Sequence, residues 1–72
     1  MIVLYIHDKI NPTLKIVCME YDLIINVKKI IMHKHKYMYD FNLYKNNCKL
    51  KDHLSIKDYG INNGDTLEIS NK

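Results

Sequence analysis

Arginine and alanine are absent from this 72-residue sequence, and glycine, proline and cysteine are scarce, with two, one and two residues. The eleven basic side chains are therefore all lysines, and the formal net charge is only +3. Recognition of base edges in the DNA major groove relies on the arginine fork. The sequence thus predicts no direct nucleic-acid contact. An RNA-binding adaptor, whose affinity would fall steeply with salt, remains an open third interpretation.

Long apolar runs are missing as well. No stretch approaches the roughly 18 apolar residues of a membrane helix, and the N-terminus has neither a basic region nor a small-residue cleavage site. Cys18 and Cys48 lie far apart and form no disulfide framework. We therefore expect a protein without membrane contact in a reducing compartment, with Cys18 as a small buried hydrophobe.

The size of the chain favours binding over catalysis. Hydrophobic residues make up 47% of the sequence, which indicates a globular chain. A domain of this length buries only about 60% of the surface that its unfolded chain exposes, so it cannot enclose a large active-site cavity and keep a core. We expect one domain over residues 1–72, with no catalytic residue and no cofactor.

Hydrophobic periodicity defines the N-terminal half. Apolar residues alternate over 2–6 and again over 13–19, on either side of a polar turn, which predicts a β-hairpin. The spacing then changes to three and four residues from Ile24, which predicts an amphipathic helix over 24–33. Asp22 stands just before this helix and could cap its N-terminus.

Shorter elements follow in the C-terminal half. After a connector over 37–40, the pattern predicts strands over 41–44 and 49–50, a tight helical turn over 55–59 and a last strand over 66–69. The resulting order is β-β-α-β-β-β. One amphipathic helix packed across a mixed sheet buries both apolar surfaces, so the fold class is a two-layer α+β domain.

Particular residues resemble ubiquitin and one of its relatives. Leu54–Ile61 followed by Gly64–Ile69 resembles the C-terminal half of ubiquitin, which implies a ubiquitin-like β-grasp fold. A closer resemblance is to the ubiquitin-like protein 5 family, carried by Met1-Ile2, Asp8, Cys18, Asp22, Lys28-Lys29 and Lys51–Ser55. The chain departs from that family where it ends Glu68–Lys72 without paired tyrosines, and where Asn62 replaces a family histidine.

The resemblance implies a function in pre-mRNA splicing. This branch of the superfamily is not conjugated; its members bind a short helical motif of spliceosomal proteins, in the nucleus and cytoplasm. The family aspartate that pairs with an arginine of the motif corresponds to Asp22, although the residues alone favour a cap carboxylate. We expect Tyr5, Val17 and Met19 to be further partner contacts and the protein to be a monomer.

Covalent attachment stays open as the alternative. No glycine follows Gly64, so we expect no Gly-Gly tail of the kind that activating enzymes require. The alternative interpretation is a covalent ubiquitin-like modifier, or the ubiquitin-like domain of a larger protein that acts in protein turnover.

Two further candidate sites are not supported by the sequence. His33 and His35 are two residues apart and would not face each other on a helix, and no cysteine or carboxylate cluster has zinc-site spacing, so no metal site is predicted. The hydrophobic patch of ubiquitin corresponds to Tyr44, Glu68 and Ser70, so ubiquitin-binding domains are not expected as partners.

Overall fold

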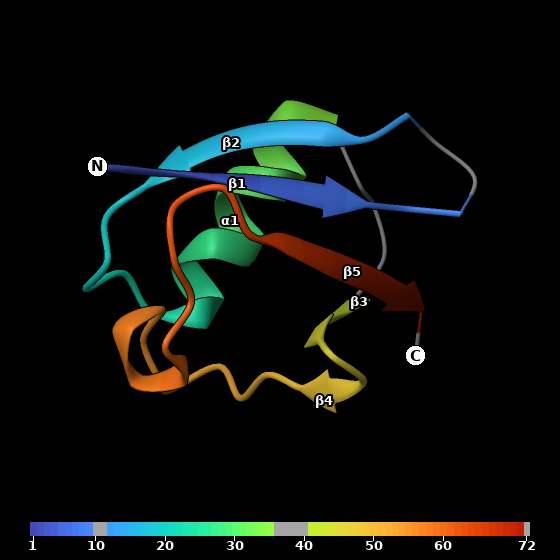
Figure 1. Cartoon of the computed structure of the whole chain (residues 1–72). Coiled ribbons are helices and arrows are strands. Elements are labelled where there is room, and N and C mark those ends of the chain that lie inside the picture. Colours follow the sequence, from blue (N-terminus) through green and yellow to red (C-terminus); the bar gives the residue numbers. More distant parts are fainter. Residues whose placement is uncertain (10–11, 36–40, 72) are drawn as a thin grey trace.

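The computed structural model describes residues 1–9, 12–35 and 41–71, except for the side chains of residues 35 and 71 (Figure 1). The elements are β1 (Ile2–His7), β2 (Leu14–Cys18), α1 (Ile24–His35), β3 (Phe41–Lys45), β4 (Cys48–Lys49), the 3-10 helix η1 (Lys57–Tyr59) and β5 (Thr66–Asn71). The predicted connector over 37–40 lies outside the described residues.

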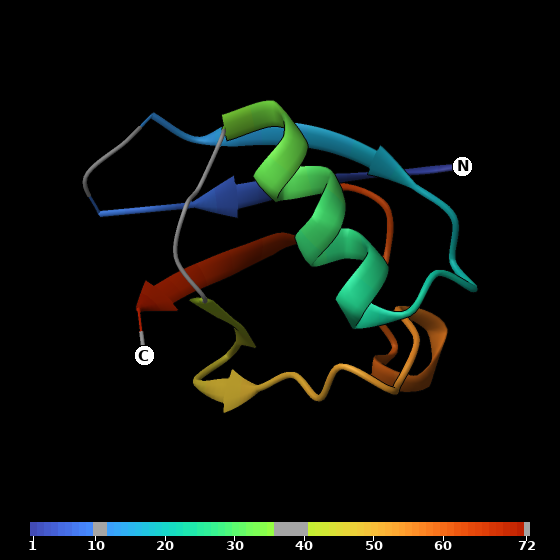
Figure 2. The ribbon, with the colours of Figure 1, turned by 180° about the vertical axis from the view of Figure 1, so that it is seen from behind.

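The strands form one mixed sheet in the order β2-β1-β5-β3-β4. β1 pairs antiparallel with β2 and parallel with β5, while β3 pairs antiparallel with β5 and β4. In this order, β2 and β4 are the two edges of the sheet. Helix α1 crosses one face of the sheet (Figure 2). The predicted ubiquitin-like β-grasp fold is confirmed.

The core lies between α1 and the inner face of the sheet. Alternation places Leu4 opposite Ile16 and Ile6 opposite Leu14, and the odd-numbered residues of β1 and β2 face outward. The helix contributes Ile24, Val27 and Ile31, which are fully buried as the 3.6-residue period predicts. The remaining buried apolar residues are Cys18, Phe41, Leu43, Leu50, Ile56, Ile61 and Leu67.

The helix α1 begins at Ile24 as predicted, but its capping differs from the prediction. The Ile24 N–H donates to the Leu54 carbonyl at 2.8 Å and the Ile25 N–H donates to the Asp52 carbonyl at 3.2 Å. A β-bridge between Leu23 and Ser55 places residues 52–55 alongside the helix start. Backbone carbonyls thus satisfy amides that a side chain would otherwise cap. The prediction that Asp22 caps the helix is therefore wrong.

Several element boundaries also differ. α1 continues to His35 instead of ending at His33, and β4 occupies Cys48–Lys49, not 49–50. β5 extends past its last apolar residue to Asn71, because its residues 68–71 pair with β3. These backbone hydrogen bonds do not depend on side-chain polarity, so the apolar pattern gives no indication of them.

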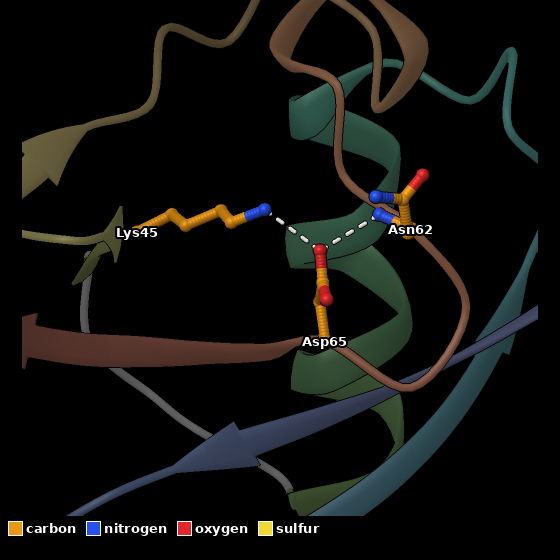
Figure 3. A network of polar contacts seen from close by, with 3 residues as sticks. All are labelled: Lys45, Asn62 and Asp65. Atoms are coloured by element: carbon orange, nitrogen blue, oxygen red, sulfur yellow. Dashed lines mark hydrogen bonds and ion pairs between the residues drawn. The ribbon is translucent and has the colours of Figure 1, made fainter.

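A polar network ties the turn before β5 to β3 (Figure 3). One carboxylate oxygen of Asp65, Oδ2, accepts from the Asn62 N–H and from Lys45 Nζ, both at 2.7 Å. These two bonds, the Lys45 bond foremost, lower the pKa of Asp65. Gly64, at φ 88°, lets the turn approach β1, where its N–H donates to the Val3 carbonyl at 2.7 Å.

Candidate functional site

Asp22 fastens the turn between β2 and α1. Its Oδ2 accepts a hydrogen bond from the Met19 N–H at 2.9 Å, and its own N–H donates to the Met19 carbonyl at 3.0 Å. Its carbonyl accepts from the Ile56 N–H at 3.0 Å, which links the turn to the segment before η1. The main-chain amide of Met19, close in sequence, thus orients the carboxylate.

The other carboxylate oxygen of Asp22, Oδ1, has no donor among the residues that the structure describes. Asp22 is half-buried, and within the described ranges it forms no ion pair. Met19, its hydrogen-bonding neighbour, is 50% exposed. An oriented carboxylate with one unused oxygen therefore lies beside an exposed apolar side chain.

Val17 and Tyr5 lie on the outer face of the sheet. Val17 is opposite Val3 and Tyr5 is opposite Lys15, so Val17 and Tyr5 are diagonal neighbours. Their side chains are 43% and 39% exposed. The structure thus brings Val17, Met19 and Asp22 to one corner of the sheet, with Tyr5 beside them. We call these four residues the Asp22 surface.

The remaining sequence candidates are far less suited to a site. Cys18 is buried as predicted, and burial, with a smaller contribution from the Asp22 carboxylate, raises the pKa of its thiol. His33 is exposed, and the described side chains include no cluster of three metal-ligating residues. Tyr44 is half-buried opposite Glu68, so this part of the sheet is not a uniformly apolar patch.

No helix in the part of the chain that the structure describes is long and apolar enough to cross a membrane.

Two relatives match nearly the whole sequence. The ubiquitin-like modifier HUB1 of Debaryomyces hansenii is 31% identical over 70 residues, which cover 96% of both proteins. The ubiquitin-like modifier HUB1 of Eremothecium gossypii is 29% identical over the same share of both. The chain belongs to the ubiquitin-like protein 5 family. The two relatives thus confirm the predicted membership of the ubiquitin-like protein 5 family. No family model matches the sequence.

Two exposed apolar residues next to Asp22 are not among the partner contacts that the sequence predicts for this member of the ubiquitin-like protein 5 family. Tyr21 and Leu23 flank Asp22 and are both exposed. Lys57 of η1 holds its ammonium 4.9 Å from the centre of the Tyr21 ring, a cation–π contact. Both residues lie between the alternating pattern of β2 and the helical spacing of α1, where neither pattern assigns an apolar side chain to the core. Apolar residues outside both patterns are the sequence signal that could have identified them.

Proposed function

We propose that this chain is a non-covalent protein-binding module that acts in the nucleus and cytoplasm by docking a short helical motif of spliceosomal proteins. The main support is the geometry of Asp22. Its carboxylate is half-buried and oriented by the Met19 amide, while Oδ1 has no donor within the described chain. An arginine of the motif supplies the missing donor and the missing positive charge. The proposal involves no catalytic step and no cofactor.

The apolar members of the Asp22 surface give the motif its second point of attachment. An amphipathic helix presents apolar side chains at spacings of three and four residues. Those side chains pack against Val17 and Met19, with Tyr5 at the far end of the surface. Apolar burial supplies affinity, and the arginine pair fixes the register of the helix on the surface.

The size of the electrostatic contribution follows from burial. An ion pair between exposed side chains contributes only about 0.2–1 kcal/mol. Truncating one partner of a desolvated interfacial pair costs more, roughly 2–5 kcal/mol. Asp22 is already half-buried before any partner binds. We therefore expect the loss of its charge to weaken binding at least about tenfold, or about 1.4 kcal/mol.

The substitution Asp22→Asn tests this proposal. The amide oxygen can still accept from the Met19 N–H, so the turn and the melting temperature should stay near wild type, while the charge is lost. Asp22→Ala removes both and should also destabilise the fold by about 0.5–1.5 kcal/mol, the contribution of one hydrogen bond. The variants are titrated with an amphipathic helical peptide that carries one arginine, and with its Arg-to-Gln counterpart.

The outcomes separate cleanly. Weak binding by Asp22→Asn, matched by weak binding of the Gln peptide to wild type, supports the arginine pair. Equal affinities of wild type and Asp22→Asn for the Arg peptide would exclude it. A quantitative pulldown from nuclear extract, with wild type and Asp22→Asn as baits, then tests whether the partners are spliceosomal proteins. Spliceosomal proteins should be captured by wild type and depleted with Asp22→Asn.

Covalent attachment is the second candidate function, because both relatives are described as modifiers. A conjugated protein would appear in lysate as ATP-dependent adducts of the chain that survive SDS. We expect none. The appearance of such adducts would favour the covalent function over the docking module.

A further inference from the structure

Within the part of the chain that the structure describes, the backbone of β2 has hydrogen-bonding groups without a partner along its outer edge. In β1, the Val3 N–H donates to Asn63 Oδ1 at 2.7 Å and the Tyr5 N–H donates to the Asp65 carbonyl at 3.0 Å, both away from β2. Hydrogen-bonded and non-hydrogen-bonded pairs alternate along an antiparallel ladder. Lys15 and Val17, which face Tyr5 and Val3, therefore direct their N–H and C=O groups away from the sheet.

One of these groups has a partner. Lys34 Nζ, from α1, donates to the Lys15 carbonyl at 3.3 Å. Among the described residues, none bonds to the Lys15 N–H or to the N–H and C=O of Val17. The edge of β2 therefore offers two donors and one acceptor at the spacing of a β ladder, and a fourth group that is held by a flexible ammonium. Such an edge is a template for an added strand.

A basic depression on α1 lies beside this edge. It is open, and the described residues that line it, none of which is a carboxylate, are Lys29, Ile30, His33 and Lys34. Ile30 is half-buried and packs against the core, while both lysines are exposed. Lys34 also contacts β2, so the depression and the free edge are adjacent. Figure 2 shows the C-terminal end of α1 reaching β2.

We propose that the free edge of β2 binds an extended peptide segment of a partner protein, rich in β-branched residues and carboxylates, as a sixth strand. Main-chain bonds to Lys15 and Val17 provide the pairing, and one face of the added strand packs on Ile30. Carboxylates of the segment pair with Lys29 and Lys34, and Lys34 leaves the Lys15 carbonyl to an incoming N–H. This ligand is extended and acidic, unlike the arginine-bearing helix proposed for the Asp22 surface.

The probe is a blocked heptapeptide, Asp-Glu-Ile-Val-Ile-Glu-Asp, whose near-symmetric sequence tests both strand directions at once. Its control has lysine at all four acidic positions. We expect saturable binding of the acidic peptide in a calorimetric titration and at least about tenfold weaker binding of the control, a difference of about 1.4 kcal/mol. Amide exchange should slow at Lys15 and Val17 in the complex.

Two pairs of variants isolate the two contributions. Lys15→Pro removes an edge N–H that makes no bond within the described chain, which an edge strand tolerates, whereas Lys15→Ala keeps it. Lys29→Glu with Lys34→Glu reverses the charge of the depression, and Lys49→Glu with Lys51→Glu makes the same change in net charge elsewhere on the exposed surface. We expect Lys15→Pro and the first double variant to bind at least about tenfold more weakly than their controls.

Several outcomes would overturn the proposal. Absence of binding at millimolar peptide would mean that Lys34 merely shields the edge from other strands. Equal affinities within each variant pair, or protection of amides outside β2, would place the peptide on another surface. If Lys15→Pro failed to fold, the charge pair and the exchange measurement on wild type would still decide the question.

Discussion

The bond between Lys45 and Asp65 links β3 to the turn before β5, and its contribution to stability can be measured. Their side chains are 23% and 29% exposed, and the 2.7 Å bond shares Asp65 Oδ2 with the Asn62 N–H. Fully exposed pairs contribute about 0.2–1 kcal/mol, and hydrogen bonds to charged groups about 1.5–3 kcal/mol. For this partly buried pair we expect a coupling energy of about 1–1.5 kcal/mol, between those two ranges.

A double-mutant cycle with Lys45→Met and Asp65→Asn isolates this coupling, because the asparagine oxygen can still accept from the Asn62 N–H. Urea unfolding at pH 7 and low salt gives the free energy of unfolding for each variant. Asp65→Ala, which also loses the turn bond, should be destabilised by a further ~1 kcal/mol. A coupling energy indistinguishable from zero would refute the assignment of this bond as a stabilising link.

The carboxylate of Asp65 also makes the stability of the folded protein depend on pH in the acid range. The folded state lowers the pKa of Asp65 below its usual value of 3.8, so its unfolded form binds protons more tightly. The stabilisation is therefore complete above pH 3.8 and is lost as pH falls through the lower, folded pKa. Wild type should lose stability in this window more steeply than Asp65→Asn. Parallel curves for the two proteins would contradict the cause given for the shift.

Three further predictions concern the core, the thiols and the β3–β4 turn. Val27→Asp places an unpaired charge at a fully buried position and should abolish the cooperative melting transition in circular dichroism. Exposed Cys48 should react with a maleimide in the native protein, whereas buried Cys18 should react only on unfolding, as mass spectrometry of labelled peptides can show. Asn47, at φ 65°, should accept glycine without loss of stability, whereas Asn47→Val should lower the free energy of unfolding by about 1–3 kcal/mol.

The fold could be predicted from the sequence because side-chain periodicity and burial agree along most elements. The change from alternation in β2 to helical spacing at Ile24 locates the hairpin and the helix, and the inward residues that it names, such as Val27, are buried. The same rule could not give the end of β5. There the ladder with β3 continues through Ser70, whose polarity carries no information about pairing.

The site was less accessible to sequence reasoning, because its properties depend on groups distant in the chain. Asp22 has the residue type and position of a cap, yet the carbonyls of residues 52 and 54 occupy the amides that it would have bound. No local pattern reports that a segment 30 residues away will lie there. The free edge of β2 depends in the same way on strand order, which places Lys15 and Val17 at the margin of the sheet.

The charge of Asp22 is separable from the stability of the fold. The helix start is satisfied without it, and the Met19 amide needs only an oxygen acceptor, which asparagine would supply equally well. A half-buried carboxylate loses hydration, and here no cation within the described chain offsets that loss. The negative charge thus has no counter-ion among the described residues of the domain. This is the physical reason to seek its counterpart, a cation, on a binding partner.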